Sequence, residues 1–177
     1  TSVTGVQTCA LPILITTNDL NLIIRECEIQ MDTSPASIAG FAAAYGAMKY
    51  AAENMKKDYF FSSPNFLEEE ILTWAEMIYP EKNKNGYRNG PVVVGGRLAP
   101  PHITIPRLMA EFCEAVCEDR IDDSTEVYRQ FELIHPFVDG NGRTGMLLWM
   151  AHMYYKNGRV WPETLPPNVF GDPRLEN

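Results

Sequence analysis

One segment, from His135 to Met146, carries residue types whose chemistry suits phosphates. It reads His-Pro-Phe-Val-Asp-Gly-Asn-Gly-Arg-Thr-Gly-Met, with an apolar run on each side. Backbone N–H groups in a glycine-rich turn, together with the positive end of a following helix, bind anions such as phosphate. The Gly140-Asn141-Gly142 sequence therefore predicts an anion-binding turn at the start of a helix.

Three charged or titratable side chains flank this turn. Asp139 is a candidate Mg²⁺ ligand, because hard cations bind carboxylates and substrate phosphates together. Arg143 is a candidate for forked hydrogen bonding to the same phosphates. His135, with an ordinary pKa near ~6.5, is the candidate base that takes a proton from an attacking hydroxyl. The segment as a whole predicts phosphoryl or nucleotidyl transfer to a hydroxyl group.

Each piece also has an ordinary structural interpretation. Asp-Gly and Asn-Gly pairs are common turn formers, and a histidine before a turn is often structural. The combination of base, carboxylate, glycine turn and arginine within nine residues favours the functional interpretation.

At these residues the sequence resembles the Fic family, whose signature is H-x-F-x-[D/E]-G-N-G-R-x-x-R. His135, Phe137, Asp139 and the run Gly140–Arg143 match that signature, whereas Met146 stands at the position of its second arginine. The resemblance implies a mainly α fold, a Fic-type helical bundle with a short β-hairpin flap.

The resemblance also implies a reaction, with ATP and Mg²⁺ as cofactors. His135 would be the catalytic base and Asp139 the metal ligand. AMP would pass from ATP to a Ser, Thr or Tyr hydroxyl of a target protein, releasing pyrophosphate. An inhibitory antitoxin chain is a second partner to consider. The residues implied to bind the nucleotide are Phe137, Gly140, Asn141, Gly142 and Arg143.

Met146 leaves the donor open. In the family the second arginine contacts the terminal phosphate and pairs with an inhibitory glutamate in an S/T-x-x-x-E-[G/N] helix, and neither partner is found in this sequence. AMP transfer would then need another basic residue, Arg88 or Arg97, at the terminal phosphate. The alternatives are a phosphocholine-type or UMP-type donor, and a noncatalytic module that binds a nucleotide or peptide. A Doc-type kinase is less favoured, because Doc-like sequences resemble Asn-Lys-Arg at the turn.

Composition bounds the class of protein. The chain has 177 residues, which suits one domain, with 45% hydrophobic and 21% charged residues. A net charge of −8 disfavours nucleic acid as a partner, because phosphate backbones attract basic surfaces. No apolar run approaches the ~20 residues of a membrane span. We therefore expect neither a nucleic-acid nor a membrane partner, and a cytoplasmic location in a bacterial or phage setting.

Apolar periodicity predicts the helices that must position the segment. Ser34-Pro35 and Ser63-Pro64 each combine a helix cap with a proline in the first turn. Thr104 and either Asp123 or Ser124 are expected to cap two further helices, the second of which ends at His135. A helix over 14–30 and a central helix from Arg143 to Asn157-Gly158 complete the bundle. The domain is expected over 14–160, with its core at about 34–158 and an irregular tail over 161–177.

Two other segments call for interpretation. A polar loop over 82–90 precedes a predicted hairpin, which resembles the target-binding flap of Fic proteins and offers a strand edge for a peptide. A hairpin that merely caps the core is the alternative. Val3 to Ile13 look like the translation of a short-read sequencing adapter, so residues 1–13 are interpreted as an artefact or a disordered segment. The flap residues are Val92, Val93, Val94, Gly95, Gly96 and Arg97.

Overall fold

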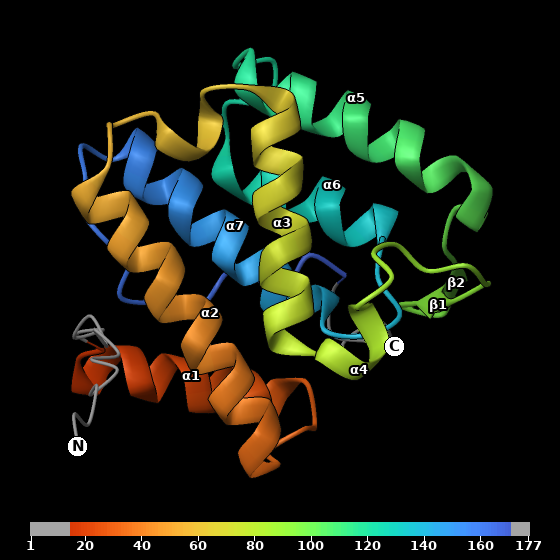
Figure 1. Ribbon diagram of the computed structural model, residues 1–177, viewed down its shortest axis with the longest axis horizontal. Helices are drawn as coiled ribbons and strands as arrows, with labels where there is room; N and C mark the ends of the chain where they lie inside the picture. Colours follow the sequence, from red (N-terminus) through yellow and green to blue (C-terminus); the bar gives the residue numbers. More distant parts are fainter. Residues whose placement is uncertain (1–14, 171–177) are drawn as a thin grey trace, which may run out of the picture.

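The computed structural model describes residues 15–170, in which helices and one small hairpin follow one another (Figure 1). The predicted mainly α class with a short hairpin is confirmed, whereas the adapter-like residues 1–13 lie outside the described part. No described helix is long and apolar enough to cross a bilayer. The elements are α1 (Thr17–Ile29), α2 (Pro35–Asn54), η1 (Tyr59–Phe61), α3 (Pro64–Ile78), α4 (Pro80–Asn83), β1 (Val93–Val94), β2 (Arg97–Leu98), η2 (His102–Thr104), α5 (Ile105–Cys117), α6 (Ser124–Ile134) and α7 (Asn141–Lys156).

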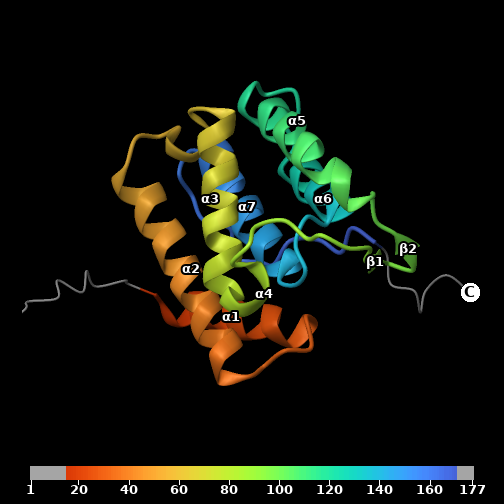
Figure 2. The ribbon, with the colours of Figure 1, turned by 45° about the vertical axis from the view of Figure 1, so that its right-hand side comes forward.

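Helix α7 is the centre of the bundle. Every residue from Asn141 to His152 is buried, as expected for a helix that is apolar on nearly all sides. Helices α2, α3 and α6 all pack against it, and the two views show α7 enclosed between α2 and α3 on one side and α6 on the other (Figures 1 and 2). The site segment runs from His135 into the first turns of α7, so its glycine turn lies where the most buried helix starts.

Helix caps form largely where the sequence places them. The side chains of Ser34, Ser63 and Asp123 each accept a hydrogen bond from the backbone N–H three residues later. Thr104 stands at the N-cap of α5, but its hydroxyl bonds to the Pro101 carbonyl instead. Thr104 is thus the N-cap residue of α5, as predicted, but without a side-chain capping hydrogen bond.

The expected polar loop over 82–90 is more ordered than its composition suggests. Its first residues belong to the short helix α4, and Asn83 and Arg88 are buried. The Arg88 guanidinium donates to the carbonyl oxygens of Gly90, Pro100 and His135. This segment therefore ties the base of the hairpin to the end of α6.

The hairpin forms as predicted, with Val94 opposite Arg97 and Val93 opposite Leu98. Gly95 and Gly96 form its two-residue turn, and both have positive φ values, 53° and 74°. Turns of this kind need φ > 0 at both positions, which glycine adopts without steric cost. Residues 161–170, the described part of the expected tail, contain no helix or strand.

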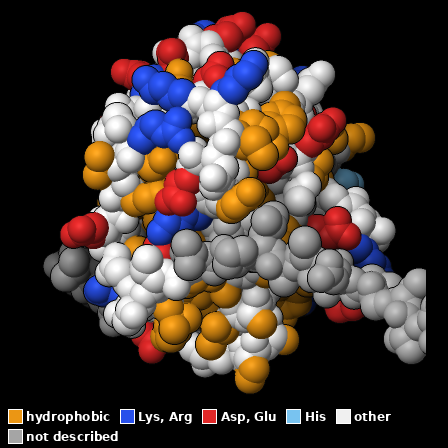
Figure 3. Space-filling view, turned by 60° about the vertical axis from the view of Figure 1, so that its left-hand side comes forward, with side chains coloured by type: hydrophobic (Ala, Val, Ile, Leu, Met, Phe, Trp, Pro, Cys, Tyr) orange, Lys and Arg blue, Asp and Glu red, His pale blue; other side chains and the backbone are white. Residues whose placement is uncertain are grey.

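The surface carries charges of both signs. On the face drawn in Figure 3, Lys and Arg side chains lie among Asp and Glu side chains rather than in a basic patch of their own.

Helices α2 and α3 approach closely at Gly40, which sets the position of the α3 end beside the site. A Cβ at this position would lie 2.8 Å from the Met77 carbonyl oxygen and 3.0 Å from that of Ile78. These contacts are with backbone, which yields less readily than a side chain. The Ile78 side chain in turn lies against Gly140.

We expect Gly40→Ala to lower the free energy of unfolding by about 1–3 kcal/mol because of this collision. Helix propensity alone predicts the opposite sign, a gain of up to ~1 kcal/mol. Denaturant unfolding measures the difference. Gly90→Ala is the control, since nothing lies within 4 Å of its added Cβ, and equal stability of the two variants would contradict the close approach.

Candidate active site

His135 is held in a constrained backbone conformation at the end of α6. It has left-handed φ and ψ values of 49° and 61°, and its N–H donates to the Phe131 carbonyl. A positive φ is uncommon outside glycine and marks a residue that its surroundings hold in place. Its own carbonyl accepts from Arg88 Nε at 2.8 Å. The backbone position from which the imidazole projects is therefore fixed.

The His135 imidazole is largely enclosed, with 22% of its side chain exposed. Nδ1 is buried without a hydrogen-bond partner among the described residues, and Glu132 Oε2 lies 3.8 Å from it. Burial lowers the pKa of His135 to about 4, against an opposing effect of the Glu132 backbone. His135 is therefore neutral near pH 7 and able to accept a proton.

A reciprocal pair of hydrogen bonds shapes the turn after His135. The Phe137 N–H donates to Asn141 Oδ1 at 2.9 Å, and Asn141 Nδ2 donates to the Phe137 carbonyl at 3.0 Å. The Phe137 ring is wholly buried and packs near Tyr87 and Phe131. The ring therefore belongs to the core and anchors the turn, and the cofactor-binding role of Phe137 stays a prediction.

The start of α7 has the features of an anion-binding turn. Gly140 is the N-cap, with φ of 74°, and no side chain caps the helix there. The first intrahelical hydrogen bond runs from Thr144 N–H to the Gly140 carbonyl. The N–H groups of Asn141, Gly142 and Arg143 precede that bond, so they have no acceptor within the helix and lie at its positive end.

The C-terminal end of α1 covers part of this turn, which the sequence did not indicate. A Cβ at Gly142 would collide with the Gln30 side-chain amide. Gln30 Nε2 donates to Glu26 Oε1 at 2.8 Å, and Glu26 is itself buried. Burial raises the pKa of Glu26, while the Gln30 hydrogen bond and the Arg143 charge lower it. The sequence signal that could have indicated this contact is the pair Glu26 and Gln30, two polar residues that are four apart and therefore share one face of the helix.

Arg143 points inward rather than toward solvent. Only 1% of the residue is exposed, and its Nη1 donates to the Ser37 hydroxyl. Carboxylate oxygens of Asp32 and Asp139 lie 3.7 Å from its guanidinium nitrogens. The guanidinium therefore ties α7 to the start of α2, and its expected phosphate contact stays a prediction.

Asp139 is half-exposed and already has partners. Its Oδ1 accepts from the Gly140 N–H at 2.7 Å, and its Oδ2 pairs with Lys82 Nζ at 2.6 Å. Lys82 also lies over the Tyr79 ring, 4.3 Å from its centroid. Lys82, 57 residues away in sequence, is a basic residue at the motif that sequence spacing could not reveal.

A magnesium site at Asp139 would need ligands from outside the protein. The described residues contain no group of three or more His, Cys, Asp or Glu side chains that could hold a metal ion. Mg²⁺ characteristically uses one or two carboxylates and completes its shell with substrate phosphates and water. A half-exposed Asp139 beside the anion-binding turn fits that pattern.

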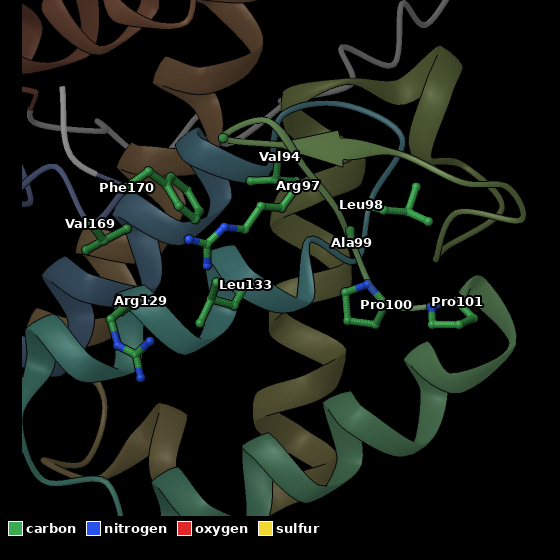
Figure 4. Close-up of a pocket in the computed structure, with 11 residues that line it drawn as sticks. Val94, Arg97, Leu98, Ala99, Pro100, Pro101, Arg129, Leu133, Val169 and Phe170 are labelled. Atoms are coloured by element: carbon green, nitrogen blue, oxygen red, sulfur yellow. The ribbon is translucent and has the colours of Figure 1, made fainter. Parts of the chain in front are cut away.

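The predicted flap borders a cavity of about 740 Å³. Arg97 extends into it from β2, toward Leu133 and Phe170 (Figure 4). None of residues 135–146 lines this cavity. The cavity therefore lies on the hairpin side of α6, and the target-binding role of Arg97 and the other flap residues stays a prediction.

Met146 belongs to the core. It is fully buried in the second turn of α7, so no basic side chain takes the second-arginine position.

Together these features define a helical domain with a neutral imidazole and a carboxylate beside an anion-binding helix start. Residues 50–153 match the family model described as Fic/DOC family. The match covers more than half of the chain, and the chain belongs to that family.

Two individual proteins are similar to parts of the chain. Over 97 residues it is 30% identical to a probable protein adenylyltransferase of Aquifex aeolicus (strain VF5), a match that covers 48% of this chain and 30% of that protein. A crystal structure of a Fic family protein from Desulfovibrio desulfuricans G20 aligns with a TM-score of 0.49 and 23% identity, covering 80% of this chain and 43% of that one. The chain thus spans less than half the length of either.

We expect Asn141→Ala to lower the free energy of unfolding by about 2–4 kcal/mol, because it removes both hydrogen bonds and leaves two buried backbone groups unsatisfied. Thermal and denaturant unfolding measure the change. Asn85→Ala, at an exposed loop position, should change stability by less than ~0.5 kcal/mol. A similarly small effect at Asn141 would show that the turn does not depend on its side chain.

Proposed function

We propose that this domain is a Mg²⁺-dependent protein adenylyltransferase, which transfers AMP from ATP to a Ser, Thr or Tyr hydroxyl of another protein. The observation that carries the proposal is the neutral His135 next to the uncapped start of α7, with Asp139 between them in the chain. The name of the Aquifex aeolicus relative, a probable protein adenylyltransferase, supports the same reaction class.

His135 acts as the general base. Its Nδ1 is buried, so Nε2 is the nitrogen left to meet a substrate. The target hydroxyl gives its proton to Nε2 while its oxygen attacks the α-phosphorus of ATP, and the bond to pyrophosphate breaks. Positioning and charge stabilisation carry most of the rate enhancement in reactions of this type.

The nucleotide phosphates are bound by the N–H groups at the start of α7. Mg²⁺, when bound, neutralises charge on the phosphates, and Asp139 would hold it. The Arg88 guanidinium already donates to backbone carbonyl oxygens, and Arg97 lines the hairpin cavity. Lys82, in contact with Asp139, is therefore the basic residue that we assign to the terminal phosphates in place of the missing second arginine.

The target protein is bound at the hairpin. Val93 and Leu98 are 67% and 73% exposed, and a strand edge with exposed apolar side chains suits an extended peptide. Arg88 joins the hairpin region to the His135 carbonyl, so a peptide seated there is held at a set distance from the base. An inhibitory antitoxin chain and a cytoplasmic location stay predictions.

A donor that lacks a terminal phosphate is the second candidate. Arg143 is buried and Met146 belongs to the core, so residues 139–146 of the turn offer no exposed arginine. That arrangement suits a diphosphate-linked donor of the phosphocholine type, which presents less negative charge than ATP.

The first test supplies ATP labelled on either the α- or the γ-phosphate, with Mg²⁺ and a cell lysate. We expect label to reach protein from the α position only. His135→Ala should lower the rate at least ~10²-fold, a typical contribution of a general base, with nucleotide affinity unchanged. His102→Ala, at an exposed residue, is the control. Label from the γ position would contradict nucleotidyl transfer.

The second test concerns the metal. Because Mg²⁺ must displace Lys82 from Asp139, we expect Lys82→Met to tighten Mg²⁺ binding about 2–5-fold, the equivalent of an exposed ion pair worth ~0.5–1 kcal/mol. Calorimetric titration without nucleotide measures this. Lys84→Met, at an exposed neighbour, should leave the affinity unchanged, and an unchanged affinity in Lys82→Met would argue against Asp139 as the ligand.

A further inference from the structure

A buried carboxyl group lies one helical turn before His135. Glu132 is 4% exposed, and its Oε1 has no hydrogen-bond partner among the described residues. Its other oxygen lies 3.8 Å from His135 Nδ1, which has no side-chain hydrogen-bond partner in the described part of the chain. Burying such groups unpaired is costly, so two adjacent ones call for an explanation.

The surroundings of Glu132 are shaped to hold its carboxyl group. A Cβ at Gly145 would lie 2.8 Å from Glu132 Oε1 and about as close to Tyr128 and Phe131, so the absence of a side chain there makes room. The charged neighbour Glu26 has the same sign. Among the described residues, His135 is the one ion-pair partner found for Glu132.

The charge balance of this cluster changes during the proposed reaction. Burial first, and then the charge of Glu26, raise the pKa of Glu132 to about 8. Burial lowers the pKa of His135. Each group is thus disfavoured in its charged form while the other is neutral. Where Glu132 is ionised, the proton that the imidazole gains places an opposite charge beside the carboxylate, and a buried charge is tolerated when it is paired.

We infer that Glu132 is a positioning residue for His135. Its carboxyl group accepts a hydrogen bond from Nδ1–H, keeps Nε2 free of its proton, and faces the imidazolium that forms when Nε2 takes the target's proton. No proton leaves Nδ1 and no bond to Glu132 forms. The catalytic part of this inference rests on the proposed function, whereas the hydrogen bond does not. A base oriented by a third group is a recurring arrangement in enzymes.

The present separation is compatible with this role. Hydrogen bonds of this type have donor–acceptor distances of about 2.7–3.2 Å, so the carboxyl must approach Nδ1 by less than ~1.2 Å. Contacts of catalytic groups are often long until the substrate binds. The Glu132 backbone also raises the pKa of His135. The test must therefore change the Glu132 side chain and leave its backbone in place.

The tautomer of His135 gives that test on the protein alone. The chain has three histidines, and ¹⁵N-histidine NMR at pH 9 distinguishes protonated from unprotonated ring nitrogens, with His135→Ala as the assignment standard. We expect Nδ1–H in the wild type and in Glu132→Gln, whose amide oxygen still accepts. In Glu132→Leu we expect Nε2–H to become the major form. Identical His135 signals in all three proteins would overturn the inference.

Two controls keep the test decisive. The His152 signals report folding, because its Nδ1 bonds to the Ser124 hydroxyl inside the bundle. Should Glu132→Leu fail to fold, Glu132→Met, with an adaptable apolar side chain, replaces it. Replacement of a buried ionisable group by an apolar one of similar size is often tolerated.

The transfer assay then separates this inference from the proposed function. We expect Glu132→Leu to slow AMP transfer about 10–100-fold with the KM for ATP unchanged, and Glu132→Gln to recover part of the loss. Transfer that is equally fast in wild type and Glu132→Leu, with the tautomer unchanged, overturns the role of Glu132 and leaves the proposed function standing. No transfer by any protein, with the tautomer responding to residue 132, overturns the proposed function and leaves the Glu132–His135 pairing standing.

Discussion

The candidate site depends on where α7 begins. A helix that is buried on all sides can expose its first N–H groups only if the preceding segment turns sharply and is itself fixed to the core. The hydrogen bonds between Asn141 and Phe137 meet both conditions, because they close the turn while the Phe137 ring is buried. The positive end of the helix is thereby placed beside His135 and Asp139, whose side chains remain partly accessible.

A second constraint joins elements that are far apart in the chain. Arg88 reaches carbonyl oxygens at Gly90, Pro100 and His135, which belong to the hairpin region and to the end of α6. One guanidinium with its donors satisfied in this way fixes several backbone segments at once. Movement of the hairpin base would therefore disturb the backbone of His135, so the proposed target-binding hairpin and the proposed base share a mechanical connection.

The sequence predicted the fold class, the main helices, the hairpin and the turn, because these depend on local signals. Ser34, Ser63 and the Gly95-Gly96 pair determine their helix starts and turn through neighbours only a few residues away. The direction of the Arg143 side chain and the approach of Lys82 to Asp139 depend instead on how α2, α4 and α7 pack. Apolar periodicity predicts which face of a helix is buried, but it does not predict which polar group of another element contacts that face.

The buried charges explain why local signals fail at this site. Arg143 is enclosed and lies between carboxylates from two segments, so its buried charge is compensated and the guanidinium contributes to the packing. Glu132 has no such cation at rest. The type of a residue therefore does not by itself determine the role of that residue. In this domain the charge of Arg143 is compensated before any substrate binds, whereas an ionised Glu132 gains a compensating charge only when the proposed reaction places a proton on His135.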